Sequence, residues 1–207
     1  DGTFGKIKAP DPTKYHVYHE DFNTYAAADF TITTTEDGTG SATEALGDGD
    51  GGLLVITNAA GDNDHDFFQL VKEGFKYEAG KQIAFKARFK TSDADASDVV
   101  MGLQLTDTSP LNVTDGMFFL LTDGSTTLQF IVEKDSTQST LDLPTAIEDD
   151  TFTTVGFVYS PKDQKFHVFQ NNVLAGTVVN TNAPDDEEMT VSFGIQNGAA
   201  AAKVLTV

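Results

Sequence analysis

Residues 82–90 constrain the fold most, because apolar and basic side chains alternate along this segment. Successive side chains of a β-strand point to opposite faces, so strict alternation predicts a strand with one face in a core and the other in water. The apolar members are Ile83, Phe85, Ala87 and Phe89, and the basic members are Lys86, Arg88 and Lys90.

Other short runs of strand length recur along the chain, separated by turn signals. Residues 117–121 are apolar throughout, which predicts a strand covered on both faces. Asn171-Asn172 and Asn197-Gly198 lie between apolar runs and predict hairpin turns. No long amphipathic helix is visible, so the sequence predicts an all-β fold of two antiparallel sheets. The other strand-like runs are residues 30–33, 53–57, 101–105, 128–132, 155–159, 166–168, 173–179, 189–195 and 203–207.

Residues 1–28 depart from this pattern and are predicted to form an extended arm, followed by one sandwich domain over residues 29–207. Pro10 and Pro12 disfavour a helix or a central strand. The aromatic side chains of the arm follow no period, and we expect them to dock either on the chain's own sandwich or on a neighbouring subunit. The expected contact residues are Tyr15, Tyr18, Phe22 and Tyr25.

The net charge of −19 limits the partners that this chain can bind directly. Such a chain repels the phosphates of nucleic acids and an anionic membrane surface. The sequence contains no apolar run of about 18 residues, so it predicts no membrane span. The basic stripe, formed by the three cations of residues 82–90, is the exception to this acidic character. Lys86 and Arg88 either face an acidic neighbour or protect an edge strand from aggregation. With no cysteine, neither disulfides nor thiol chemistry are available.

Three alternating carboxylates form the best candidate for a metal site. Asp62, Asp64 and Asp66 follow one another within a polar stretch, and Ca²⁺ takes six to eight oxygen ligands. The pattern lacks the glycine and glutamate of an EF-hand loop. The alternative is a solvated turn in which the aspartates accept hydrogen bonds from backbone N–H groups. We therefore expect either no cofactor or a low-affinity Ca²⁺ site.

Seven segments carry a resemblance to a known group of proteins: residues 61–69, 83–90, 102–108, 114–119, 132–136, 184–189 and 193–198. Through them the chain beyond the arm resembles virion proteins of tailed phages, common in marine phages, which have a concanavalin A-like jelly roll. The resemblance implies a decoration (cement) protein that binds the major capsid protein and stabilises the head shell, as a homo-oligomer such as a trimer. It also implies a place on the capsid surface of the virion after synthesis in the host cytoplasm.

No catalytic motif stands out. Retaining glycoside hydrolases on this fold carry a Glu-x-Asp-x-x-Glu strand, which is absent here, and the chain has no tryptophan to stack on sugar rings. None of the four histidines has a recognisable serine or cysteine partner. We therefore expect a protein that is not an enzyme.

Two other functions remain open, because this sandwich is also similar to laminin-G and legume-lectin domains, many of which bind sugars or Ca²⁺. The first is a carbohydrate-binding module or adhesin on a phage head or tail fibre, with a glycan as its partner. It predicts exposed tyrosine or phenylalanine rings on a concave face, near asparagine and aspartate. The second is a hydrolase, which requires two close carboxylates in a groove.

Overall fold

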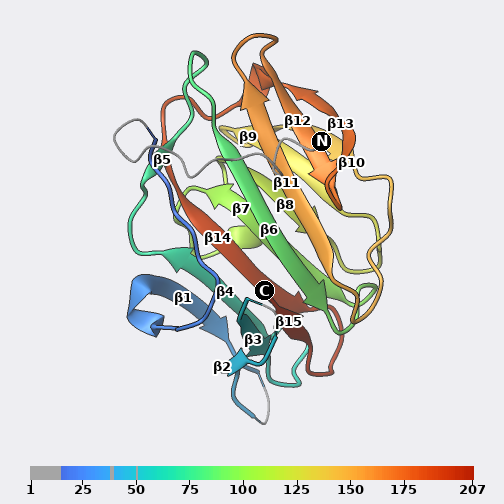
Figure 1. Cartoon of the computed structure of the whole chain (residues 1–207). Helices are drawn as coiled ribbons and strands as arrows, with labels where there is room; N and C mark the ends of the chain where they lie inside the picture. Colours follow the sequence, from blue (N-terminus) through green and yellow to red (C-terminus); the bar gives the residue numbers. More distant parts are fainter. Residues whose placement is uncertain (1–14, 38–39, 50) are drawn as a thin grey trace.

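The computed structural model describes residues 15–37, 40–49 and 51–207, and these form a sandwich of two antiparallel sheets (Figure 1). The first sheet places the long strand β14 (Glu188–Asn197) between β4 and β7, and β5 (Phe75–Lys76) also pairs with β14. Its strand order is β1 (Phe30–Thr35), β4 (His65–Leu70), β14, β7 (Ser97–Gln104), β8 (Gly116–Leu121), β9 (Gln129–Lys134) and β10 (Thr137–Asp142).

The second sheet is divided near its middle. Within the described residues, β6 pairs with β15 only where Lys90 and Thr91 meet Thr206 and Leu205, so residues 84–89 of β6 have no strand partner on that side. The order is β13 (Val173–Val179), β12 (Lys165–Gln170), β11 (Thr153–Ser160), β6 (Ala84–Thr91), β15 (Val204–Thr206), β3 (Leu53–Thr57) and β2 (Thr43–Gly47).

Helical structure in the described residues is limited to short 3₁₀ turns, and no helix there is long and apolar enough to cross a membrane. The expected boundary between arm and sandwich, at residues 28 and 29, falls inside the first of these turns. Residues 1–14 of the predicted arm lie outside the described part of the chain. The three turns are η2 (Ala27–Asp29), η3 (Pro110–Asn112) and η4 (Asn180–Asn182).

Aromatic rings fill the space between the sheets. Phe68 of β4 and Phe193 of β14 stack with 5.2 Å between ring centroids, and Phe157 of β11 packs against Phe130 of β9 at 5.1 Å. The alternation of residues 83–89 is confirmed, since Phe89 is fully buried in the core. Tight packing of these rings explains how the chain folds without a disulfide.

The outer face of the first sheet is covered by its own loop. Leu111 and Val113, from the loop between β7 and β8, pack on a second apolar cluster that includes Phe67 and Phe118. The Gln69 amide holds the loop: its Nε2 donates to the carbonyl of Leu105, and its Oε1 accepts from the N–H of Asp107. Strand 117–121 is therefore covered on both faces, as predicted.

The two predicted hairpins have different outcomes. Asn171 and Asn172 do form the β12–β13 turn, with left-handed φ angles of 51° and 64°. The hairpin at Asn197-Gly198 is wrong, because β14 and β15 belong to different sheets. The buried Asn197 amide instead donates to the carbonyls of Ala59 and Gly61, which sends the chain across the sandwich.

Candidate binding site beneath the N-terminal arm

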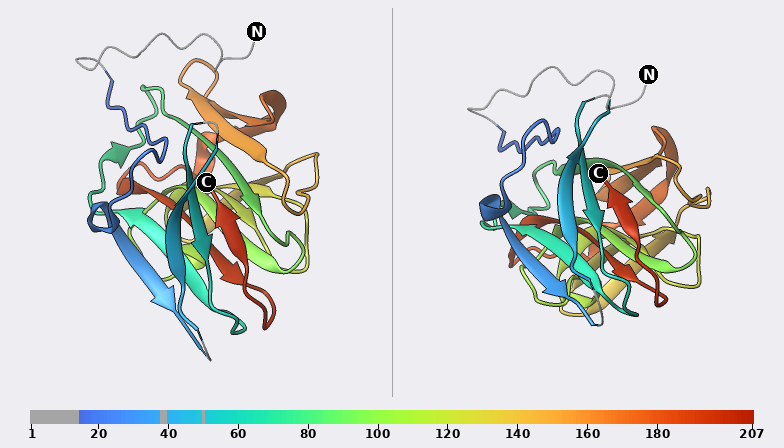
Figure 2. Two further views of the ribbon diagram at one scale, coloured as in Figure 1. Left: turned by 60° about the horizontal axis from the view of Figure 1, so that its bottom comes forward. Right: turned by 90° about the horizontal axis from the view of Figure 1, so that it is seen from below.

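The arm docks on the chain's own sandwich at two points. Phe22 is only 7% exposed, and its ring meets Phe193 edge-on with 6.0 Å between centroids. Nearer the N-terminus, the His16 ring packs edge-on against Phe75 at 5.1 Å. The arm, drawn in blue, crosses β14 in Figure 1, and Figure 2 shows it beside the β2–β3 turn. The sequence left open whether the arm docks on its own sandwich or on a neighbouring subunit, and in this structure it docks on its own sandwich.

A local turn fixes the anchor at Phe22. The carboxylate of Glu20 accepts the N–H of Phe22 at 2.8 Å and that of Asp21 at 3.1 Å, and Phe22 takes a left-handed φ of 48°. Gly52 allows the close approach: a Cβ there would lie 2.5 Å from the carbonyl oxygen of Asp21, at a φ of +83°. Glycine is the residue that combines both conditions.

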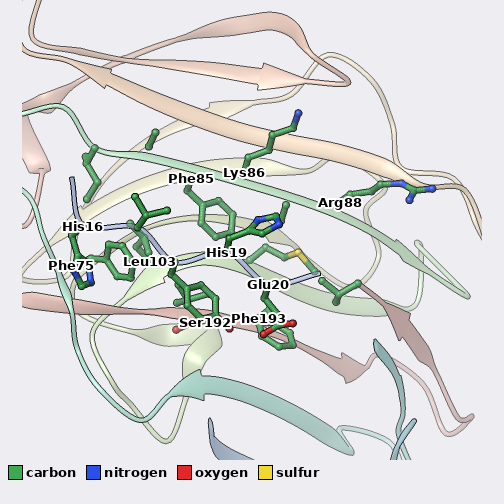
Figure 3. Close-up of a pocket in the computed structure, with 18 of the residues that line it drawn as sticks. His16, His19, Glu20, Phe75, Phe85, Lys86, Arg88, Leu103, Ser192 and Phe193 are labelled. Carbon is green, nitrogen blue, oxygen red and sulfur yellow. The ribbon is translucent and has the colours of Figure 1, made fainter. Parts of the chain in front are cut away.

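A cleft of about 1340 Å³ lies between the arm and the divided second sheet. Its floor consists of apolar residues of both sheets, and it opens where residues 84–89 of β6 have no strand partner on one side. Figure 3 shows Phe85, Leu103 and Phe193 within it. The apolar floor residues are Ile83, Phe85, Ala87, Met101, Leu103, Val191 and Phe193.

The mouth of the cleft gathers aromatic rings on one wall and cationic side chains on the other. Tyr15 and Tyr18 of the arm are 56% and 37% exposed. Lys86 and Arg88 stand opposite on the outward face of β6, and Figure 3 shows both pointing away from the floor. Together with Phe22, these four residues from the sequence-based list line one cleft. Tyr25, the remaining member, instead stacks on Phe30 and meets the edge of Phe68.

Arg88, the single arginine of the chain, is held in an unusual setting. Its guanidinium carbon lies 3.8 Å from the centroid of the Phe152 ring, within the range of a cation–π contact. Among the described residues no carboxylate forms an ion pair with it, whereas Lys90 pairs with Asp150 at 3.6 Å. The guanidinium N–H donors therefore face the solvent at the mouth of the cleft.

The acidic groups of the cleft are engaged in holding its shape. Its carboxylates, among the described lining residues, are Glu20, Asp21 and Glu78. Glu20 holds the arm turn, and Glu78 pairs with Lys81 at 2.7 Å. Burial, followed by the nearby charge of Glu20, raises the pKa of Tyr18 to about 12. Its hydroxyl is therefore neutral at pH 7.

The three predicted calcium ligands have different surroundings. Asp62 is exposed; Asp64 is buried, and its carboxylate accepts the N–H groups of Gly61 and Asp37. Asp64 thus takes the turn-stabilising role that was the alternative. In the described part of the chain, no group of three or more acidic or histidine side chains is placed to hold a metal. The calcium site stays a prediction to which the structure adds no support.

Asp66 is instead a buried carboxylate inside the sandwich. It is fully buried, and the Thr34 hydroxyl donates to one oxygen at 2.5 Å. Neither its second oxygen nor the Tyr25 hydroxyl has a hydrogen-bond partner among the described residues. Burial is the main cause that raises the pKa of Asp66 to about 6, and nearby Glu44 adds to it.

Sequence reasoning missed Phe152, Gly52 and the floor of the cleft. Phe152 follows a short acidic run and has no periodic partner, so nothing local indicates that its ring lies under Arg88. Gly51-Gly52 reads only as a loop. One signal was available: a single arginine in a chain of net charge −19 is a conspicuous residue.

Comparison with known proteins places the fold. No family model and no curated protein matches the sequence. Similar solved structures include the potassium-bound carbohydrate recognition domain of Emp46p, with a TM-score of 0.58, 11% identity and 86% of each chain covered. A protein of unknown function from Shewanella oneidensis MR-1 has a TM-score of 0.57 and 15% identity, over 90% of this chain and 83% of that one.

A third similar structure is an enzyme, the endo-β-1,4-glucuronan lyase of the fungus Trichoderma reesei. Its TM-score is 0.53 at 9% identity, over 84% of this chain and 87% of that one. None of the three carries the name of a virion protein, so they add no support to the phage interpretation. Identities this low show architecture alone. The chain therefore has the jelly-roll sandwich fold of concanavalin A-like proteins.

Proposed function

We propose that this protein binds acidic oligosaccharides in the cleft beneath its N-terminal arm. The observation that carries the proposal is Arg88, stacked on Phe152 at the cleft mouth and without a carboxylate partner in the described residues. A guanidinium presents a planar fork of donors that matches a carboxylate or sulfate in two parallel hydrogen bonds. Stacking on a ring holds that fork in place before the ligand arrives.

The opposite wall supplies surfaces for sugar rings. Tyr15 and Tyr18 present exposed rings, which combine an apolar face with a hydroxyl group. The volume of about 1340 Å³ exceeds that of a typical small-molecule pocket, which supports an oligomer as the ligand. The resemblance in fold to a carbohydrate recognition domain and to a glucuronan lyase agrees with this ligand class, as an analogy.

The net charge of −19 does not rule out an acidic ligand at this place. At physiological ionic strength, charges separated by more than about 8 Å are largely screened from one another in water. The ligand therefore responds mainly to the charged groups that line the cleft. These are the cations Lys76, Lys81, Lys86 and Arg88 and the carboxylates Glu20, Asp21 and Glu78. Binding by these cations weakens as salt increases, because the contacts are exposed.

The proposed role is binding without turnover. Glycoside hydrolysis uses two carboxylates on either side of the scissile bond. Glu20 and Glu78, which line this cleft, are occupied in the arm turn and in an ion pair. No feature of the described residues favours a capsid over a glycan as the partner.

Calorimetric titration tests the proposal with one variant and one control. Oligoglucuronate is titrated into the wild type, Arg88→Gln and Lys162→Gln, where Lys162 is an exposed cation outside the cleft. We expect Arg88→Gln to weaken binding by roughly 10- to 100-fold, as for hydrogen bonds to charged groups, and Lys162→Gln to leave it unchanged. Absence of binding to the wild type at millimolar ligand overturns the proposal.

A further inference from the structure

Strand β6 has an open edge in the interior of the second sheet. The N–H of Tyr159 donates to the carbonyl of Ile83, directly opposite, at 2.8 Å. In an antiparallel pair such bonds recur at every second residue, so the odd-numbered residues of β6 bond to β11 and the even-numbered ones point to the other side. On that side β15 pairs only with the end of β6. The backbone groups of Ala84 and Arg88 therefore face the cleft, and they have no hydrogen-bond partner among the described residues.

This edge differs from the outer edges of the two sheets, because it lies inside a cleft and has a different character on each face. The cleft, of about 1340 Å³, extends from β6 to the arm. On the inward face of β6, Phe85 and Ala87 belong to the apolar floor. On the outward face, Lys86 and Arg88 present cations (Figure 3). A strand added at this edge therefore meets apolar surface on one face and positive charge on the other.

The wall opposite β6 is held by side-chain contacts. Within the described part of the chain, residues 15–25 of the arm make no backbone–backbone hydrogen bond. Ring contacts anchor the arm, with Phe22 on Phe193 and His16 on Phe75. Moving this wall breaks ring contacts but no backbone ladder. The cleft is thus able to widen for a strand, whose neighbours in a sheet lie about 4.8 Å apart.

We propose that the cleft binds an extended peptide segment of a partner protein, with alternating acidic and apolar residues, as an antiparallel strand added to β6. The backbone groups of Ala84 and Arg88 supply the hydrogen bonds. Residues of the added strand that exchange these bonds point their side chains to the outward face, where carboxylates meet Lys86 and Arg88. The residues between them point inward, onto the apolar floor.

Charge and pattern together select this partner. A basic strand is repelled by the two outward cations, and a strand that is polar on both faces leaves the floor uncovered. The unpaired backbone of β6 carries this proposal, so it does not rest on the glycan ligand. The two ligands share Arg88, and we expect them to compete.

Two N-methylated forms of one peptide test the pairing without altering the protein. The probe is fluorescein-labelled Glu-Val-Glu-Val-Glu-Val, and fluorescence anisotropy measures its binding to the full chain. Methylation of the glutamate nitrogens, which point to β6, is expected to weaken binding by more than about 10-fold, because it removes donors and blocks the approach. Methylation of the valine nitrogens, which point away, leaves the affinity unchanged. The lysine-valine analogue of the probe is expected not to bind.

Hydrogen exchange resolved by NMR locates the bound peptide within one strand. We expect the peptide to slow exchange at the amides of Ala84 and Arg88, while those of Phe85 and Ala87, which bond to β11, keep their rates. Equal binding of the two methylated peptides, protection at another sheet edge instead, or no binding at millimolar probe overturns the proposal. Because the peptide is titrated without sugar, the result does not depend on whether oligoglucuronate binds.

Discussion

The guanidinium of Arg88 lies over the ring of Phe152, with 3.8 Å from Cζ to the ring centroid. The contact joins β6 to the segment that precedes β11, and it sets the chain's single arginine at the mouth of the cleft. The Nζ atom of Lys90 lies 5.5 Å from the centroid of the same ring. The ring of Phe152 thus contacts two of the three cations of β6, Arg88 and Lys90.

Replacing Phe152 tests whether the ring positions the arginine. Phe152→Leu keeps apolar bulk and removes the π face, so we expect oligoglucuronate affinity to fall about 2- to 5-fold, the scale of an exposed cation–π contact. Calorimetric titration measures the change, with Val71→Ala as a control at an exposed apolar position elsewhere. Unchanged affinity in Phe152→Leu would show that the ring does not organise Arg88.

Two neighbouring glycines separate backbone strain from contact with the arm. Gly51 and Gly52 both have left-handed φ angles, of 94° and 83°, but a Cβ at Gly51 meets open space whereas one at Gly52 meets the arm backbone. We expect Gly52→Ala to lower the free energy of unfolding by about 1–3 kcal/mol more than Gly51→Ala does. Urea denaturation of both variants checks this, and equal losses would contradict the close approach.

The Phe22 anchor is expected to control the arm without controlling the sandwich. Phe22→Ala removes the ring that meets Phe193, so amide hydrogens near residues 20–23 should exchange faster, while those of β7 and β8 keep their protection. Hydrogen exchange followed by mass spectrometry reports both regions. Val17→Ala, at a half-exposed position, is the control. Faster exchange throughout the sandwich would mean that the arm is part of the main folding unit.

Asp66 makes stability depend on pH in a definite direction. Its pKa is raised from about 3.8 in the unfolded chain to about 6 in the fold, so the charged form destabilises the fold. The destabilisation is present above pH 6, shrinks as pH falls through 6, and is absent below pH 3.8.

The variant Asp66→Asn removes this charge and keeps an oxygen for the Thr34 hydroxyl. We expect it to exceed the wild type in free energy of unfolding at pH 8, by on the order of 1–3 kcal/mol, and to match it near pH 4. Urea denaturation at both pH values, with exposed Asp62→Asn as a control, decides the point. A constant difference between pH 4 and pH 8 would contradict the raised pKa.

The sequence predicts most of the strands, because alternation is a local signal. Strand β6 was expected at residues 82–90 and is found at Ala84–Thr91. Strand β10 was not predicted: its sequence, TQSTLD, has a single apolar residue, Leu141, so no period of two is visible. The hairpin at Asn197 failed because a buried amide network, which joins residues far apart in the sequence, determines where the chain goes.

The cleft could be predicted only in part. Aromatic residues of the arm and the cations of β6 were identified separately, since each set has its own local pattern. They come together because β15 pairs with only the end of β6 and because Phe22 packs on Phe193, which are contacts between distant segments. Phe152 and Gly52 have their roles only because of what lies against them in space.

Chemical-shift mapping by NMR tests the central claim most directly. An isotope-labelled sample is titrated with oligoglucuronate, and a neutral cello-oligosaccharide serves as the comparison. The account predicts that the acidic ligand shifts amide and side-chain signals of the arm from Tyr15 to Phe22 and of β6 near Arg88. It also predicts little change from the neutral sugar. Shifts confined to the loop over β7 and β8, or no shifts at millimolar ligand, would contradict it.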